Sequence, residues 1–213
     1  MKKILFTAFE PFAGRKENPS LHVMAALKAS AFPGCRLYRE RLPVAGAAVE
    51  RRLPALLARV KPDLMVSLGL AAGEASLRVE RFALNIKDYG IKDNAGRSPE
   101  GEPVDPKGPA AYLVNTDPAA MAAAARRAGI PAYVSNHAGA YVCNNLMYAA
   151  MRAIELGGLK TRFAFIHLPL TTAMAAAEKP GRAVPPSLPL ADLALAVQYA
   201  AKSALGKGTL FTI

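Results

Sequence analysis

The sequence predicts an α/β protein: a three-layer α/β/α sandwich around a twisted central sheet that is mostly parallel or mixed. Short apolar runs alternate along the chain with segments of helical periodicity. Strands joined through helices pair in parallel by right-handed crossovers, and the helices then cover both faces of the sheet. At 213 residues the chain has the size of one domain, so we expect residues 1–213 to form a single domain. The site of such a fold is expected outside the carboxyl ends of its strands.

The first half of the chain supplies four of the predicted strands and two helices. Strands are predicted at 3–9, 36–44, 63–70 and 76–86. The first and third are continuously apolar, as in strands buried on both faces, whereas the second and fourth alternate. One helix is predicted to begin at Asn18, whose side chain can cap it, with Pro19 in its first turn. Another spans 46–60, where Pro54 is expected to kink it.

The second half repeats the alternation. Strands are predicted at 132–136 and 162–170, and helices at 117–130, 143–158 and 190–206. Asp117 is the expected cap of the first of these helices and Gly129 its terminator. Two stretches, 87–116 and 172–189, are rich in glycine, proline and charge and are predicted as loops. Loops of that length in a compact domain usually carry function or contact a partner subunit.

Composition argues against several classes of protein. The 27 Lys and Arg residues exceed the 16 Asp and Glu residues, giving a formal charge of +11, but they are scattered and form no stripe. We therefore expect a solvated basic surface and no nucleic-acid partner. The apolar run after Met1 stops at Glu10 without a cleavage site, and no stretch approaches the ~18 apolar residues of a membrane span. Two cysteines fit neither a disulfide framework nor a metal site, which favours a cytoplasmic protein with reduced thiols.

Cys143 stands at the start of a predicted helix. It follows a strand and a short loop, so it falls in the first turn, near the positive end of the helix dipole. Unpaired N–H groups there would stabilise a thiolate and could receive an oxyanion. The alternative interpretation is a small buried apolar residue, and position alone favours neither. Cys35, in a turn before a strand, has no such setting and is interpreted as structural.

A cysteine nucleophile needs a base, and the chain has three histidines. His167 closes a predicted strand, at the sheet edge where the Cys143 helix begins, and is the favoured base. His22 lies within a helix pattern and is interpreted as a surface or packing residue, while His137, on the loop before Cys143, stays a candidate. Glu80, a carboxylate within an apolar strand, could orient the imidazole, although charged residues in such places usually face solvent.

The loop after the first strand is a candidate ligand wall. Phe9 and Phe12 flank a turn at a carboxyl strand end, which suggests an apolar pocket for a small ligand, with core packing as the equal alternative. The stretch "GLAAGEAS" at 69–76 lacks the spacing of a phosphate-binding glycine loop, so a nucleotide site is weakly supported.

Four motifs together resemble the pyrrolidone carboxyl peptidase (pyroglutamyl peptidase I) family of cysteine peptidases. They are "FTAFEPFAGRKENPS", "VERFALN", "SNHAGAYVCNNLMY" and "FIHLP", and the resemblance runs from residue 4 to about 205. It implies a catalytic domain that removes N-terminal pyroglutamyl residues from peptides through a thioester. It also implies no metal or organic cofactor, a cytoplasmic location and a homo-oligomer, commonly a tetramer.

The resemblance also implies roles for individual residues. The family's nucleophile, histidine and acid fall on Cys143, His167 and Glu80. Its apolar ring pocket maps to Phe9, Phe12, Ile91, Tyr141 and Val142. Its lactam-binding asparagine maps to Asn18.

The chain departs from the family pattern at several positions. Leu70 stands where members carry a glutamine associated with the ring, and Glu74 where they carry an arginine. Val44 replaces a frequent threonine, and His137 a small or polar residue. The departure at Leu70 bears on lactam recognition and not on the three catalytic positions.

Two other functions remain open at this point. One is a catalytically weak or altered-specificity relative, or a silent binding protein, because of Leu70 and Glu74. The complete Cys, His and Glu set argues against a silent protein, which has no need of an activated thiol. The other is a nucleoside-phosphorylase-like enzyme on the same type of sheet, which would require a phosphate site that the sequence does not contain.

Overall fold

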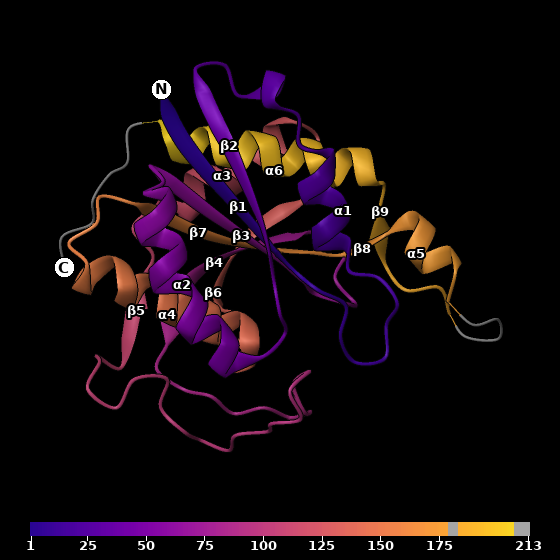
Figure 1. Ribbon diagram of the computed structural model, residues 1–213. Helices are drawn as coiled ribbons and strands as arrows, with labels where there is room; N and C mark the ends of the chain where they lie inside the picture. Colours follow the sequence, from indigo (N-terminus) through magenta and orange to yellow (C-terminus); the bar gives the residue numbers. More distant parts are fainter. Residues whose placement is uncertain (179–182, 207–213) are drawn as a thin grey trace.

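The middle layer is a seven-stranded sheet in the part of the chain that the structure, a computed structural model, describes: residues 1–178 and 183–206. Figure 1 shows its strands crossing the centre of the molecule. The strands are β1 (Lys2–Phe9), β2 (Cys35–Leu42), β3 (Leu64–Leu70), β4 (Leu77–Leu84), β5 (Ala111–Leu113), β6 (Ala132–His137) and β7 (Arg162–Leu168). Their order is β2-β1-β3-β7-β4-β5, and β6 also pairs with β4.

The sheet is mixed because β4 reverses direction. Strands β2, β1, β3 and β7 are parallel, whereas β4 runs antiparallel to β7 and β6 runs parallel to β4. The link from Ala71 to Ser76, between β3 and β4, is shorter than the dozen or so residues that a parallel crossover needs. The predicted fold class is confirmed, but the expectation of parallel pairing is wrong for β4 against β7.

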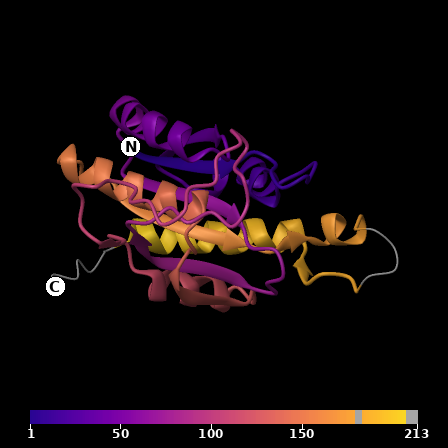
Figure 2. The same cartoon turned by 90° about the horizontal axis from the view of Figure 1, so that it is seen from below.

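Helices cover both faces of the sheet and complete three layers. Helices α1 (Pro19–Ala26), α3 (Pro118–Arg127) and α6 (Leu190–Leu205) pack on one face in one apolar core. Helices α2 (Gly46–Val60) and α4 (Val142–Leu156) pack on the other face in a second core. In Figure 1 the first group lies above the strands and the second below them, and Figure 2 shows the same layers from below.

Helix boundaries follow the predicted caps. The Asn18 side chain accepts a hydrogen bond from Ser20 N at 3.1 Å, and the Asp117 side chain accepts one from Ala120 N at 3.0 Å. Gly129, with φ of +83°, takes the left-handed conformation that ends the α3 segment. Pro54 lies on the exposed face of α2, and the helix continues through it.

The two predicted loops contain short elements that their composition concealed. Strand β5 lies within 87–116. Helix α5 (Thr172–Ala176) and the small pair β8 (Leu170–Thr171) and β9 (Ser187–Leu188) lie in or beside 172–189, of which 179–182 are outside the described residues. A 3₁₀ turn, η1 (Ala29–Ala31), precedes β2. Each is too short to give a periodic pattern.

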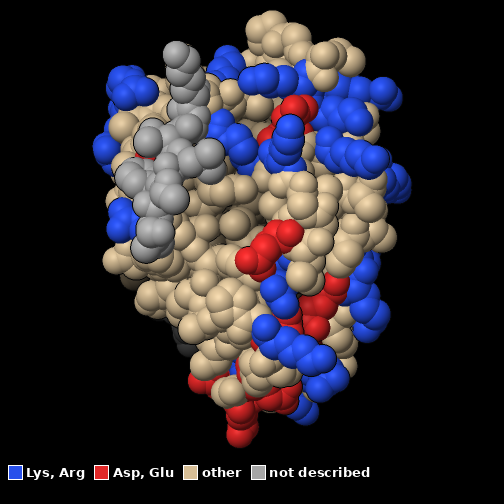
Figure 3. Space-filling model, turned by 90° about the vertical axis from the view of Figure 1, so that its left-hand side faces the viewer, with Lys and Arg blue, Asp and Glu red and all other residues tan. Residues whose placement is uncertain are grey.

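The surface carries both signs of charge. Figure 3 shows one face, on which Lys and Arg side chains are interrupted by Asp, Glu and uncharged residues. Within the described residues, no helix has both the length and the apolar character needed to cross a membrane. The expectation that nucleic acid is not a partner remains a prediction.

Candidate active site

Strand alternation places two titratable side chains on the sheet face that α4 covers. Val79 on β4 and Ile166 on β7 point into the core formed with α1, α3 and α6. Side chains alternate between faces along a strand, so Glu80 and His167 point to the opposite face. Because β4 is antiparallel to β7, the start of β4 lies beside the end of β7, and the two side chains meet there.

Glu80 and His167 form a buried pair. His167 Nδ1 lies 2.8 Å from Glu80 Oε1, and the two residues are 5% and 0% exposed. The interpretation of Glu80 as a solvent-facing carboxylate is therefore wrong. An ionised carboxylate only accepts hydrogen bonds, so the His167 N–H must be on Nδ1, and Nε2 is left free to take a proton.

Cys143 occupies the first turn of α4, as predicted, and remains partly exposed. The pKa of its thiol is raised to about 12, mainly because burial disfavours the charged form and secondly because of the negative charge of Glu80. The positive charge of Arg78 acts in the opposite direction. Burial and the negative charge of Glu80 thus oppose the stabilisation of a thiolate that is expected at a helix start. A base beside the thiol would favour its deprotonation.

Cys143 contributes to the wall of a small apolar pocket. The pocket is lined by Phe9, Phe12, Asn18, Val44, Leu70, Tyr141, Val142 and Cys143. Six of the seven predicted substrate-binding residues are thus brought together with the cysteine. Leu70 is among them, so the departure from the family pattern lies within the pocket.

Ile91 is the predicted pocket residue that the lining does not include. It is 49% exposed, on the loop between β4 and β5 at the bottom of Figure 1. The residue after Ile91 connects this loop to the pocket: the hydroxyl of Tyr141, a pocket residue, donates a hydrogen bond to Lys92 O at 3.2 Å. The Tyr141 ring also packs against Phe12 and Tyr89, with centroids 6.0 and 4.8 Å away.

Asn18 is buried at the pocket and its amide is largely engaged. Its Nδ2 donates to Glu10 O at 3.1 Å, and its Oδ1 accepts from Ser20 N and Ser20 Oγ at 3.1 and 2.8 Å. One amide N–H of Asn18 therefore remains for a ligand carbonyl.

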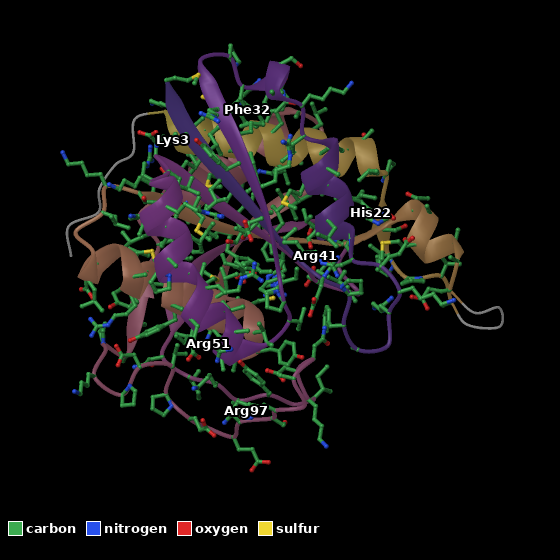
Figure 4. The ribbon with its side chains drawn as sticks, in the orientation of Figure 1. Lys3, His22, Phe32, Arg41, Arg51 and Arg97 are labelled. Atoms are coloured by element: carbon green, nitrogen blue, oxygen red, sulfur yellow. The ribbon has the colours of Figure 1, made fainter. Side chains whose placement is uncertain are left out.

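The other two histidines and Cys35 lie outside this cluster. His22 is on α1, where Figure 4 labels it, 3.8 Å from Glu17. His137 ends β6, opposite Phe82 in register, and its Nδ1 accepts from Gly139 N at 3.2 Å. Cys35 begins β2, at the amino end of the parallel strands. The placement favours His167 as the base.

Arg78 is a residue at the site that sequence reasoning missed. Its Nε lies 3.3 Å from Glu80 Oε1, and its Nη1 lies 3.6 Å from a carboxylate oxygen of Glu74. Glu74, one of the departures, also accepts from the Tyr133 hydroxyl at 3.3 Å. Two opposite charges at positions 78 and 80 of an apolar strand share one face, and that pattern could have identified the arginine.

Gly69 lies directly opposite His167 in the pairing of β3 with β7. A Cβ at Gly69 would lie 2.9 Å from Phe165 Cζ and 3.1 Å from His167 Cδ2. We expect Gly69→Ala to displace the imidazole, lowering kcat/KM about 10-fold and destabilising the fold by about 1–3 kcal/mol, as overpacking does. Steady-state kinetics and thermal unfolding would test this. Gly90→Ala, with open space around its Cβ, is the stability control, and an unchanged kcat/KM in Gly69→Ala would contradict the expectation.

Among the described residues, no group of three or more His, Cys, Asp and Glu is arranged to hold a metal ion. The pocket lining includes the polar side chains of Cys143, Asn18 and Tyr141, and the Glu80–His167 pair lies on the sheet face that α4 covers. A thiol and a histidine that can exchange a proton at Nε2 are the groups used in acyl transfer through a covalent intermediate.

The chain is similar to known proteins over nearly its whole length. The family model described as pyroglutamyl peptidase matches residues 2–207. A pyrrolidone-carboxylate peptidase from Erwinia tasmaniensis is 40% identical over 205 residues, covering 96% of this chain and 93% of the relative. One from Thermococcus onnurineus is 41% identical over 167 residues, covering 78% of this chain and 83% of the relative.

Solved structures show the same similarity. Pyroglutamyl peptidase I from Bacillus amyloliquefaciens superposes with a TM-score of 0.89 at 31% identity, covering 97% of this chain and 98% of that chain. The pyrrolidone carboxyl peptidase from Thermococcus litoralis has a TM-score of 0.89 at 33% identity, covering 96% and 94% of the two chains.

Proposed function

Because the chain belongs to the pyroglutamyl peptidase family and is a peptidase that removes N-terminal pyroglutamyl residues, we propose that Cys143, His167 and Glu80 carry out its reaction. One observation supports the assignment above the others. The buried Glu80–His167 pair leaves Nε2 free on the sheet face covered by α4, and the first turn of α4 carries Cys143, which lines an apolar pocket. The family assignment favours this peptidase over a nucleoside-phosphorylase-like enzyme.

The proposed reaction has two halves. His167 Nε2 takes the proton of the Cys143 thiol as the sulfur attacks the pyroglutamyl carbonyl carbon. N–H groups in the first turn of α4 lie where they can stabilise the resulting oxyanion. The imidazolium then gives its proton to the departing amine, the C–N bond breaks, and a thioester remains. Water, activated by His167, hydrolyses the thioester, which releases pyroglutamate and restores the thiol.

The raised thiol pKa assigns Glu80 a specific task. A thiol with a pKa of about 12 is neutral at physiological pH, so the proton must move to His167 during the attack. The Glu80 carboxylate stabilises the imidazolium that forms, as the aspartate does in serine hydrolases. The raised pKa therefore favours general-base activation of the thiol by His167 over a thiolate–imidazolium pair in the resting enzyme.

The pocket is proposed to hold the pyroglutamyl ring. Its apolar wall, formed by Phe9, Phe12, Tyr141, Val142 and Leu70, would contact the ring methylenes. Asn18 would donate its remaining amide hydrogen to the lactam carbonyl, and Ile91 would cover the ring from the adjacent loop. The tyrosine hydroxyl that holds this loop supports the last assignment.

A chromogenic pyroglutamyl amide, with an alanyl amide as control, tests the function. We expect hydrolysis of the first and not of the second. Iodoacetamide should abolish the activity and label Cys143 in preference to Cys35, as read by peptide mass spectrometry. Loss of activity with labelling at Cys35 would contradict the assignment of the nucleophile.

Leu70→Gln tests how the lactam is recognised. The ring loses water from one N–H and one carbonyl, and an unpaired buried polar group costs roughly 1–3 kcal/mol. Asn18 can satisfy the carbonyl but offers no free acceptor, since its Oδ1 already accepts two hydrogen bonds. We expect Leu70→Gln to raise kcat/KM about 10-fold, equivalent to about 1.4 kcal/mol, and to raise selectivity over a prolyl amide. If neither quantity changes, backbone groups already satisfy the lactam and Leu70 is harmless.

We also propose that residues 1–213 form one catalytic domain, supported by two cores that share one sheet. A homo-oligomer, a tetramer by the family resemblance, and a cytoplasmic location remain predictions. Light scattering of the purified protein would test the first of these.

A further inference from the structure

The sheet face that carries Glu80 and His167 also carries an arginine at its centre. Arg78 is two residues before Glu80 on β4 and directly opposite His167 in register, so all three side chains emerge on one face. Strand β4 lies between β7 and β6, which makes this a position inside the sheet (Figure 1). The arginine contacts the catalytic pair and does not line the pocket.

Glu80 lacks partners for a fully buried carboxylate. Its Oε1 is bonded to His167, and its Oε2 is buried without a hydrogen-bond partner among the described residues. Burying a charge is costly unless it is paired, so an adjacent cation is required. Arg78 Nε, 3.3 Å from Oε1, supplies it, although the contact is an ion pair and not an aligned hydrogen bond.

The Arg78 guanidinium is itself held in place from two sides. Nη2 donates to Ser135 Oγ and to His137 O, both at 3.1 Å, which anchors it to β6. Nη1 faces Glu74 at 3.6 Å on the more exposed side. Hydrogen bonds to β6 therefore fix the planar guanidinium group, and its Nε faces Glu80.

We propose that Arg78 is a positioning residue of this enzyme: it holds the Glu80 carboxylate against His167 and places a positive charge beside this buried pair. The inference rests on the proposed roles of Cys143, His167 and Glu80. Arg78 acts through Glu80 and never touches the substrate. The charged and titratable groups around it are Glu74, Tyr133, Glu80, His167 and Cys143.

If Arg78 only connected β4 to β6 through its hydrogen bonds, its removal would not change the pKa of the Cys143 thiol. The proposed role predicts that this pKa does change. The charge of Arg78 lowers the pKa of the Cys143 thiol, against the larger opposing effects of burial and Glu80. Removing the charge should raise that pKa further. The thiolate fraction then falls, but a more basic thiolate is a better nucleophile, so the alkylation rate should fall by less than the thiolate fraction does, about 3-fold.

The experiment compares Arg78→Met, Arg78→Lys and Arg81→Met. Arg81 is the matched control, because it lies on the same strand and bonds the Asn136 side chain on β6 at 3.1 Å, but alternation turns it away from Glu80. We expect Arg78→Met to lower kcat about 10-fold with little change in KM, and to slow iodoacetamide alkylation of Cys143 about 3-fold at fixed pH. Arg78→Lys should restore most of the alkylation rate, and Arg81→Met should alter neither quantity.

The proposal and the proposed function fail in different ways. Wild-type kcat and alkylation rate in folded Arg78→Met would overturn the role of Arg78, as would equal losses in Arg81→Met. If Arg78→Met does not fold, the kcat of Arg78→Lys decides, since lysine keeps the charge but loses the fork: a lowered kcat would support the role of the guanidinium, and a wild-type kcat would overturn it. A wild-type protein that hydrolyses no pyroglutamyl amide would overturn the proposed function, while the alkylation rates would still decide the role of Arg78.

Discussion

Cys143→Ala and His167→Ala are each expected to lower kcat/KM by about 10³-fold or more, and the double variant is expected to lose little beyond that. The two residues act as a unit, because the neutral thiol cannot attack without the proton transfer that His167 provides, and His167 has no nucleophile to serve without Cys143. Such a pair is grossly non-additive. Steady-state hydrolysis of a pyroglutamyl amide by the three variants would measure it.

His137→Ala is the matched control for the choice of base. The ring of His137 bonds only the backbone of its own loop, while its carbonyl, which the substitution keeps, accepts from Arg78. We expect near wild-type activity. If His137→Ala is more damaging than His167→Ala, or if the single losses simply add in the double variant, the assignment of His167 is wrong.

Glu80→Ala is expected to damage both activity and stability. It removes the buried carboxylate that faces Arg78 and leaves the arginine only its more exposed partner, Glu74. Removing one partner of a fully buried ion pair costs about 3–5 kcal/mol, so the loss at this partly exposed arginine should be smaller. The substitution also frees the imidazole to rotate away from the thiol, so kcat should fall sharply. Thermal unfolding and kcat should therefore change together.

Glu80→Gln separates the two effects. It conserves the volume and an acceptor for the His167 N–H, and loses only the charge, so it should cost less activity than Cys143→Ala or His167→Ala. It should also destabilise the fold less than Glu80→Ala. Full activity in Glu80→Ala would show that the carboxylate does not orient His167.

Much of the fold could be predicted because its signals are local. The caps at Asn18 and Asp117 and the positions of all long helices follow from short-range hydrogen bonding and periodicity. The antiparallel orientation of β4 against β7 could not be predicted from local signals, because the relative direction of two strands depends on pairing between segments that are distant in the chain. The shortness of the 71–76 link was the available clue.

Some features of the candidate site could likewise be predicted from local sequence, and others depend on the tertiary structure. Cys143 could be located from the chain because a helix start is a local feature. Its raised pKa could not, since the burial that causes it comes from the surrounding layers. A charged residue in a strand usually faces solvent, so the strand pattern alone did not predict that Glu80 is buried. Its burial depends on contacts with His167 of β7 and with Arg78. Ile91 depends on how a long loop folds over the pocket, which local patterns do not determine.

The position of β7 has a consequence for how the enzyme is made. This strand lies between β3 and β4, yet it begins only at Arg162, whereas β3 and β4 have ended by Leu84. While the nascent chain grows, β3 therefore presents an unpaired and mostly apolar edge, and such edges are prone to aggregation. The proposed catalytic residues are affected by the same delay. Cys143 and Glu80 leave the ribosome before His167 does, so the proposed triad is complete only after the strand that completes the sheet has been inserted.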